Sequence, residues 1–463
     1  MQSPLFCDDT KRIMATVDIN ELGRQPVGRL LWRYSLPAVV GMVVTSVYNV
    51  IDRVIIGQQV GPEAIAGLAI TFPVMNLTTA LGTLVGVGSS ARVSILLGQK
   101  RHGEAAHVLG NALTLTLIIG TLYIIGFGIY LEDILRAFGA SDRTLPYAYD
   151  FMSTLLPGLL LMNLTFGFNN IQRASGYPKR AMMAMLISTA VNLVLALLFV
   201  IVLDMGIRGA ALATDIAMLT AMVFVMWHFT QKSSILHFQR GTYRPTWPIF
   251  ISIVSIGAAP ALVNTAGCLI NVLINNRLVA FGGDTAVAAA SVFTTYTQLI
   301  IMVIIGITQG MQPIVGYNYG AGHYERMRKA FTLAVAAGTV LCIVGSVGSW
   351  TIPHWVARAF TTDPGLIDAI VKCLKLSMLA FVVVGFQTVS TVFFQSIGKA
   401  GKSILLSLSR QVIFLIPLLL WLPDVWGLDG VWLSFPISDV LATIVTFVLI
   451  WWQFRTLGHK PAR

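Results

Sequence analysis

Long apolar runs recur along this chain, and no other feature of the sequence restricts its fold as strongly. Twelve such runs are present, each long enough to cross the ~30 Å of hydrocarbon in a bilayer as an α-helix. They cover residues 34–56, 64–91, 106–131, 147–171, 180–203, 209–230, 248–281, 285–316, 329–352, 369–396, 403–422 and 427–453. Transmembrane β-strands would instead give segments of about ten alternating residues. We therefore predict an all-α membrane protein with twelve transmembrane helices.

The composition agrees with a membrane protein and excludes an ordinary soluble one. Charged residues make up 11% of the 463 residues and hydrophobic residues 56%, whereas a soluble domain carries about 25% charged residues. The cysteines form no CxxC pair, and most lie within predicted spans, where thiols are usually inert packing groups. We expect neither a disulfide nor a metal site. The cysteines are Cys7, Cys268, Cys342 and Cys373.

The basic residues are divided unevenly between the two sides of the predicted membrane. A net charge of +11 can indicate a nucleic-acid partner, but here Lys and Arg gather in alternating connections. One side holds 22 of them and the other holds 4, which is a strong positive-inside signal. The segment before the first span also lacks the short apolar core of a signal peptide. We predict a multi-pass protein of the cell inner membrane, with both termini cytoplasmic and no nucleic-acid partner.

The second half of the sequence repeats the first at a nearly constant offset. The stretch "GVGSSARVSILLGQKRHGEA" lies over "TQGMQPIVGYNYGAGHYERM", so that Gly88 aligns with Gly310 and Gly98 with Gly320. We call the shift that places Gly88 over Gly310 the repeat offset. Each half contains six predicted spans, an even number, so both halves enter the membrane in the same direction.

Repeats of this kind are related by an axis along the membrane normal, and transporters place substrate sites at the repeat interface. We predict two six-helix bundles related by such a pseudo-two-fold axis around a shared central cavity. The chain then divides into a cytosolic N-terminal tail, an N-lobe, a cytosolic linker, a C-lobe and a cytosolic C-terminal tail. Their predicted ranges are 1–33, 34–230, 231–247, 248–453 and 454–463.

Asp52 is an acid inside an apolar span, in the stretch "YNVIDRVIIG". A central Asp costs roughly +2.5 to +3.5 kcal/mol on insertion scales, and such residues usually mark ion or proton pathways. The alternative is a carboxylate near the interface that pairs with Arg53. Neighbouring helical positions point about 100° apart, so this pair is awkward and a functional acid is favoured.

Two further acids lie inside predicted spans. Asp215, in "GAALATDIAMLT", fits either a coupling role or a structural hydrogen bond to a neighbouring helix. Asp439 follows Pro436 by three residues, and we interpret it as structural, bonding backbone groups that this proline frees.

Neutral polar residues also recur within the spans. Because unsatisfied polar groups are expensive in lipid, their number indicates a partly wet cavity. In the first half, Asn192 and Thr214 stand within apolar runs. In the second half, the candidates for substrate contact are Asn271, Asn275, Gln298 and Gln312.

Several stretches together resemble the multidrug and toxin extrusion (MATE) family, nearest its bacterial MepA-type branch. They are "LGRQPVGRLLWRYSLPAVVGMVV", "YNVIDRVIIG", "VGPEAIAGLAITFP", "GSSARVSILLG" and "GAALAT", and the likeness runs from about residue 22 to 453. The resemblance implies twelve helices in two lobes. It also implies export of amphipathic, often cationic, drugs or toxins against an inward flow of Na⁺ or H⁺.

The resemblance also implies roles for particular residues. Asp52 matches the first-helix acid that carries the coupling cation, and Pro37 matches the proline where that helix bends. Asn192 and Thr214 match residues of the N-lobe cation site. The family pattern places a further Asp where this chain has Ala196, which leaves Asp215 as a candidate replacement from the next helix.

We therefore expect a cation-coupled antiporter that works by alternating access, with small amphipathic molecules and the lipid bilayer as partners. No cofactor and no metal are expected, and we expect a monomer. The missing carboxylate at Ala196 favours H⁺ as the coupling ion, with Na⁺ as the alternative. A lipid-linked precursor flippase is the other transport reading, although the basic residues inside spans are scattered. An enzyme is disfavoured because the histidines show no ligand spacing.

Overall fold

The computed structural model describes residues 19–59 and 62–458, and within these ranges the regular structure is helical throughout. The predicted tail residues 1–18 and 459–463 lie outside the described residues. The first half contains α2 (Glu21–Arg24), α3 (Val27–Gln59), α4 (Pro62–Gly98), α5 (His102–Ile129), α6 (Leu131–Ala137), α7 (Leu145–Ala174), α8 (Pro178–Ala196), the π-helix η1 (Leu197–Val202) and α9 (Gly206–Thr230). The second half contains α10 (Trp247–Gly320), α11 (Tyr324–Thr351), α12 (Pro353–Arg358), α13 (Pro364–Ser377), the short 3₁₀-helix η2 (Phe381–Val383), α14 (Val384–Ser396), α15 (Ala400–Leu408), the π-helix η3 (Ser409–Leu415), α16 (Ile416–Trp426) and α17 (Leu428–Gly458).

The described residues account for all twelve predicted spans. Ten helices are long and apolar enough to cross a membrane, counting α10 once. α10 is two helices joined at Gly283, whose φ of 61° and ψ of −160° break the helix and suit glycine. This break falls in the predicted gap between residues 281 and 285. A further span is the pair α13 and α14, which is bent by 55°. The predicted fold class is thus confirmed.

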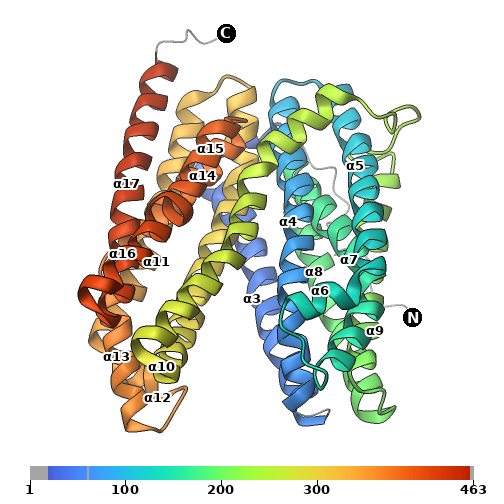
Figure 1. The fold of residues 1–463 in the computed structure, drawn as a ribbon. Helices are drawn as coiled ribbons and strands as arrows, with labels where there is room; N and C mark the ends of the chain where they lie inside the picture. Colours follow the sequence, from blue (N-terminus) through green and yellow to red (C-terminus); the bar gives the residue numbers. More distant parts are fainter. Residues whose placement is uncertain (1–18, 60–61, 459–463) are drawn as a thin grey trace, which may run out of the picture.

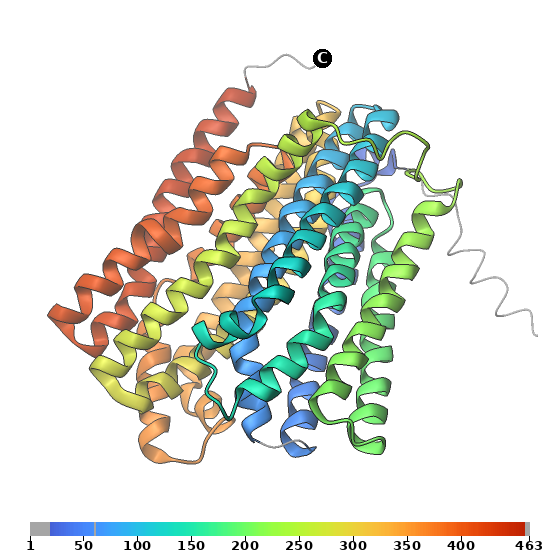
Figure 2. The same cartoon turned by 45° about the vertical axis from the view of Figure 1, so that its right-hand side comes forward.

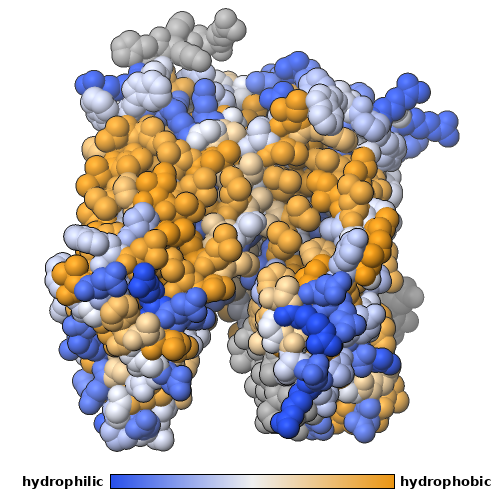
Figure 3. All heavy atoms as spheres, viewed as in Figure 1, coloured by the Kyte–Doolittle hydropathy of each residue, from blue (hydrophilic) through white to orange (hydrophobic). Residues whose placement is uncertain are grey.

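The helices form two bundles that follow each other along the chain (Figures 1 and 2). The N-lobe contains α3 to α9 and the C-lobe contains α10 to α17. We call one end of the bundles the linker end, because the segment 231–246 lies there, and the opposite end, with α6 and α12, the far end. The lobes lie close together at the linker end and separate toward the far end, where the space-filling view is hollowed between them (Figure 3).

On the face shown in Figure 3, an apolar band crosses the middle of the molecule, with hydrophilic groups toward both ends. Large apolar side chains of the protein are more than half exposed, including Leu122, Val194 and Phe447. Such an extended apolar surface is costly in water and is expected where lipid is the solvent. The chain is therefore a multi-pass membrane protein.

The lobes meet through α4 and α10, whose backbones approach closely at glycines. A Cβ on Gly98 would overlap the backbone oxygen of Tyr317, and a Cβ on Gly320 would overlap the backbone oxygen of Ile95. The repeat offset relates Gly98 to Gly320 and also relates Ile95 to Tyr317. The two contacts are therefore copies of each other, exchanged between the lobes. We call these four residues the glycine seam.

The pseudo-two-fold axis passes between two side chains that occupy equivalent positions in the repeat. Gln312 Nε2 donates a hydrogen bond of 3.2 Å to Ser90 Oγ, and the repeat offset relates these two residues as well. A residue that touches its own repeat partner must lie at the axis. The contacts of Ser90 and of the glycine seam thus show that equivalent residues of the sequence repeat occupy equivalent places in the two lobes.

The linker end is also held closed by the segment that precedes α3. Arg326 Nη2 donates to the backbone oxygens of Gln25 at 2.5 Å and Leu22 at 3.2 Å. Asn318 Nδ2 donates to the same Leu22 oxygen at 3.0 Å, and Arg326 Nε donates to Asn318 Oδ1 at 3.2 Å. Hydrogen bonds from a charged group are stronger than neutral ones. The start of the N-lobe is thereby tied to α10 and α11 of the C-lobe.

Candidate functional site

A cavity of about 220 Å³ lies within the N-lobe, which we call the N-lobe cavity. It is bounded by α3, α7, α8 and α9 and closed on one side by Gln309 of α10. Its walls are mostly apolar, with polar groups at intervals. The polar lining residues are Thr45, Tyr48, Thr165, Asn169, Arg173, Ser188, Thr189, Asn192 and Gln309.

A polar cluster centred on Tyr48 lies at one part of this wall, and Tyr48 and Asn192 belong to the cavity lining, whereas Asp52 and Thr214 do not. Asn192 Nδ2 donates to Thr214 Oγ1 at 3.1 Å, and both side chains lie close to Tyr48. Asp52 lies four residues after Tyr48, one helical turn along the same face of α3, and its carboxylate interacts electrostatically with Tyr48. One carboxylate oxygen of Asp52 is buried. Three residues proposed from the sequence thus surround one tyrosine.

Asn192 brings an open coordination position to this Tyr48 cluster. Its side chain is 2% exposed, and its Oδ1 atom makes no hydrogen bond within the described residues. A buried amide oxygen without a partner is uncommon and calls for a physical explanation. An oxygen of this kind is able to accept from a protonated group or to coordinate a hard cation.

Asp215 lies elsewhere on α9, facing α7 rather than α3. Its carboxylate occupies the space that a Cβ on Gly158 would need, and its Oδ1 atom makes no hydrogen bond within the described residues. It is not among the residues that line the N-lobe cavity. Ala196, where the family pattern has an acid, is buried at 1% exposure. That Asp215 takes over the role of the acid missing at Ala196 stays a prediction.

Pro37 lies inside α3, which continues as one helix on both sides of it. A proline in a helix interior removes one backbone donor and favours a kink. The neighbouring Ser35 Oγ donates to the backbone oxygen of Ile307 at 3.3 Å, which links this part of α3 to the C-lobe. The hinge role of Pro37 stays a prediction.

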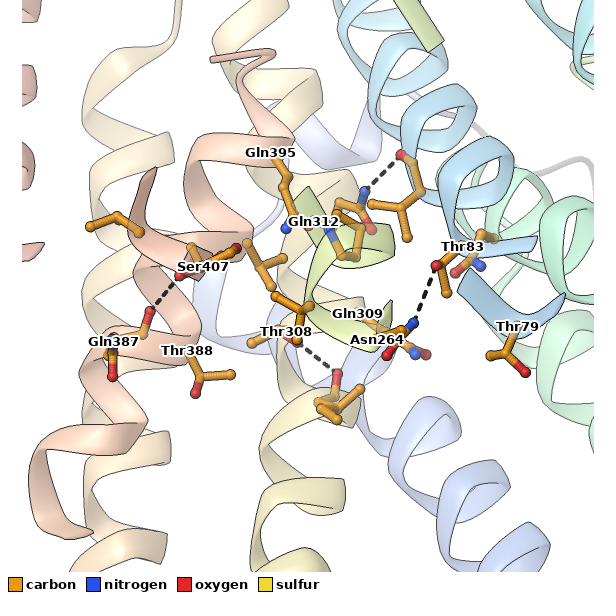
Figure 4. A pocket seen from close by; sticks show the side chains of 18 of the residues that line it. Thr79, Thr83, Asn264, Thr308, Gln309, Gln312, Gln387, Thr388, Gln395 and Ser407 are labelled. Atoms are coloured by element: carbon orange, nitrogen blue, oxygen red, sulfur yellow. Dashed lines mark hydrogen bonds between the residues drawn. The ribbon is translucent and has the colours of Figure 1, made fainter. Parts of the chain in front are cut away.

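A second cavity of about 410 Å³ lies between the lobes, which we call the central cavity (Figure 4). Polar side chains reach it from α4, α7, α10, α14, α15 and η3, and most of them are amides or hydroxyls. Asn264 Nδ2 donates to Thr83 Oγ1 at 3.4 Å across the lobe boundary. Met42, Phe166 and Gln309 line both cavities, so the N-lobe cavity and the central cavity adjoin.

The structure places the four predicted substrate contacts differently. Gln312 lines the central cavity. Asn271, Asn275 and Gln298 have exposed side chains on α10 and are not among the lining residues of either cavity. Their role in binding stays a prediction.

Sequence reasoning overlooked part of the cavity wall. Gln387, Thr391 and Gln395 all line the central cavity from α14. Their spacing of four residues puts them on one helix face, and a helical-face analysis of the span 369–396 would have found them. Tyr48 was overlooked too, although it stands one turn before Asp52.

Asp439 has a side-chain partner rather than the backbone partners suggested by its distance from Pro436. Arg410 Nε donates to Asp439 Oδ1 at 2.6 Å, and the Asp439 side chain is 4% exposed. Arg410 also lines the central cavity. The interpretation of Asp439 as a group that bonds freed backbone is therefore corrected to an intramembrane ion pair.

Comparisons with known proteins agree on one family. The sequence profile of the family described as MatE matches residues 37–198 and 260–421, one match in each lobe. The Multidrug export protein MepA of Staphylococcus aureus (strain MRSA252) is 24% identical over 428 residues, which cover 92% of this chain and 94% of that protein. The MepA protein of Staphylococcus saprophyticus is 24% identical over 421 residues, covering 91% and 93%.

A solved structure shows the same fold. It is described as the outward-facing conformation of a multidrug resistance MATE family transporter of the MOP superfamily. It is 25% identical, covers 96% of this chain and 100% of its own, and superposes with a TM-score of 0.90. The resemblance to the MATE family and its MepA-type members, first drawn from sequence motifs, is confirmed.

Proposed function

This chain belongs to the MatE family, and from that premise we propose that it is a cation-coupled antiporter that works by alternating access. As a family member it is a multidrug efflux transporter of a membrane and not an enzyme, with small molecules as substrates. The relatives named above export drugs, which favours export over a flippase for lipid-linked precursors. The expected substrates are amphipathic compounds, many of them cationic.

The position of the Tyr48 cluster is the observation that carries this proposal. Tyr48 and Asn192 line the N-lobe cavity, Asp52 and Thr214 lie next to them outside its lining, and this cavity adjoins the central cavity at Gln309. A small cation held there is close enough to influence what the larger cavity binds. In the proposed cycle, occupancy of Asp52 favours release of the substrate outward, and the emptied carboxylate favours its recapture from inside.

The available driving force is sufficient for such a cycle. One charge that crosses a potential of ~150 mV releases about 3.5 kcal/mol. For a substrate without net charge, this free energy supports a gradient of several hundredfold, since each 1.4 kcal/mol corresponds to about a factor of ten.

We propose H⁺ as the coupling ion. A Na⁺ ion needs several oxygen ligands, while a proton needs one carboxylate, and Ala196 removes an acid that the family pattern supplies. Asp215 is proposed as the second acid of the N-lobe, supported by its buried oxygen that has no hydrogen-bond partner within the described residues. Na⁺ is the alternative.

Purified protein in proteoliposomes should expel a fluorescent cationic dye when a proton gradient is imposed. A sodium gradient of equal size, imposed in separate vesicles, should have a much smaller effect, because Asp52 alone is enough to carry a proton. The measurement is dye fluorescence over time. If the dye moves under neither gradient, the antiport proposal is wrong. If it moves under the sodium gradient alone, the coupling ion is Na⁺ and not H⁺.

We also propose that the linker end faces the cytoplasm, because Lys and Arg gather in its connections. In a background without native cysteines, Ser233→Cys should react with an impermeant thiol reagent only in inside-out vesicles. Thr362→Cys, at the far end, should react in intact cells. Both positions are exposed. The opposite labelling pattern would reverse the orientation.

A further inference from the structure

The C-lobe wall of the central cavity carries a charge, and that charge is positive. Among the described residues that line the central cavity, Arg410 is the one charged side chain, and no Asp or Glu is among them. The described lining of the N-lobe cavity likewise includes Arg173 but no acid. A purely cationic substrate would therefore meet no carboxylate on these walls.

Arg410 presents its unpaired side to the cavity. Its Nε atom donates a hydrogen bond to Asp439 Oδ1. The Asp439 side chain is 4% exposed, whereas the Arg410 side chain is 29% exposed. The Asp439 carboxylate thus lies behind the guanidinium. The guanidinium has five N–H donors in a fork that fits a carboxylate, and within the described residues its bond to Asp439 is the one that it makes. Its Nη groups are left for a ligand.

Buried polar groups beside Arg410 also have no partner. Gln387 is 3% exposed and Ser407 is 7% exposed, and both line the cavity. Neither the Oε1 atom of Gln387 nor the hydroxyl of Ser407 makes a hydrogen bond within the described residues. The same holds for the Oε1 atom of Gln411. Unsatisfied buried groups are costly, so this cluster is suited to a polar group that the protein itself does not supply.

The internal repeat shows that the ion pair is not needed to pack these helices. The repeat offset relates Arg410 and Asp439 to Ser188 and Ala217 of the N-lobe. There Ser188 Oγ donates to the backbone oxygen of Ala217 at 3.4 Å, a neutral contact in the same place. A buried ion pair is weak evidence for stability, because desolvation offsets most of its attraction. Arg410 also lies in the π-helix η3, and π-helical turns are frequent at functional sites.

We propose that Arg410, with Gln387, Ser407 and Gln411, forms a subsite for a carboxylate group of the exported molecule. This inference rests on the proposed function, since it names one chemical class within the range of that exporter: amphipathic compounds with an apolar body and a free carboxylate. Arg410 determines specificity for this class, and Asp439 positions its guanidinium. The Ser407 hydroxyl donates to the second carboxylate oxygen, and the Oε1 atoms of Gln387 and Gln411, which only accept, are open to a hydrogen-bond donor elsewhere on the same molecule.

The test uses two dyes that differ in one group. Rhodamine B carries a free carboxylate, and its ethyl ester has the same ring system without it. Binding to purified protein in detergent is measured by fluorescence anisotropy. Arg410→Gln should raise the Kd for rhodamine B by about tenfold or more and leave the Kd for the ester unchanged. An equal change for both dyes, or a change for neither, would overturn the subsite.

Two further variants keep this test decisive. Arg410→Gln leaves Asp439 buried and unpaired, so the double variant Arg410→Gln/Asp439→Asn retains a neutral pair and should fold if the single variant does not. It should show the same loss for rhodamine B. The control is Arg277→Gln/Asp424→Asn, which removes an Arg–Asp pair of 3.5 Å outside the cavity wall. It should change neither Kd.

Efflux of the ester separates this inference from the proposed function. If neither a proton gradient nor a sodium gradient makes wild-type proteoliposomes expel the ester, the antiport proposal fails. The binding comparison still decides the subsite in that case. If they expel the ester and the Arg410 variants do so equally well, a selective loss of rhodamine B binding establishes the subsite within a working exporter.

Discussion

Replacing Asp52 with Asn should abolish gradient-driven efflux while the protein still inserts and folds. The side chains have nearly the same shape, so the contacts of the Tyr48 cluster are kept, but an amide neither carries a negative charge nor binds and releases a proton at neutral pH. The expected result is loss of drug resistance in cells and of dye efflux in proteoliposomes. Expression and thermal stability should match those of the wild type.

The control for this substitution is Asp368→Asn, because Asp368 is exposed and is not among the residues that line either cavity. It should leave efflux intact. Asp215→Asn then tests whether this acid stands in for the one missing at Ala196: efflux should fall as it does for Asp52→Asn. Normal resistance from well-expressed Asp52→Asn protein would remove Asp52 from the coupling mechanism.

Alanine at either glycine of the glycine seam should destabilise the protein strongly and by similar amounts. The new Cβ would overlap a backbone oxygen, of Tyr317 for Gly98→Ala and of Ile95 for Gly320→Ala. A backbone cannot rotate out of the way as a side chain can, so α4 and α10 must separate. Overpacking of this kind costs about 3 kcal/mol. The measurements are Tm in detergent and dye efflux, and both should fall.

The matched control is Gly103→Ala, near the start of α5, where a Cβ would meet nothing within 4 Å. It should be neutral or slightly stabilising, because alanine is the better helix former. The equivalence of Gly98 and Gly320 is the sharper part of this prediction. A large Tm loss for one and none for the other would contradict the symmetry of the interface.

Helix positions could be predicted from the sequence because lipid leaves few alternatives. Each backbone group in the bilayer must be paired internally, so an apolar run of sufficient length becomes a helix. Even the break at Gly283 was signalled by the interruption between residues 281 and 285. The repeat offset identified Gly98 and Gly320 as equivalent positions, but their contacts with Tyr317 and Ile95 across the lobe boundary are known only from the structure.

The polar site was harder to predict because hydropathy does not report which way a helix face points. Asn271 and Asn275 are four residues apart and share an exposed face of the first half of α10. Counting polar residues in the spans 248–281 and 285–316 could not separate these two from Gln312. The ion pair between Arg410 and Asp439 joins two consecutive predicted spans, 403–422 and 427–453. Their partnership depends on how α17 packs on η3, which the local pattern of either segment does not contain.

The contact between Ser90 and Gln312 has a consequence for how such a molecule can diversify. In an assembly of two identical chains, a position on the symmetry axis faces itself, so both sides must carry the same side chain and any substitution is felt twice. A short hydroxyl opposite a long amide is an arrangement that two identical chains cannot adopt at such a position, whereas a tandem-fused chain can. Fusion thus releases the residues nearest the axis to evolve separately, and in this chain one of the two, Gln312, has become part of the chamber wall.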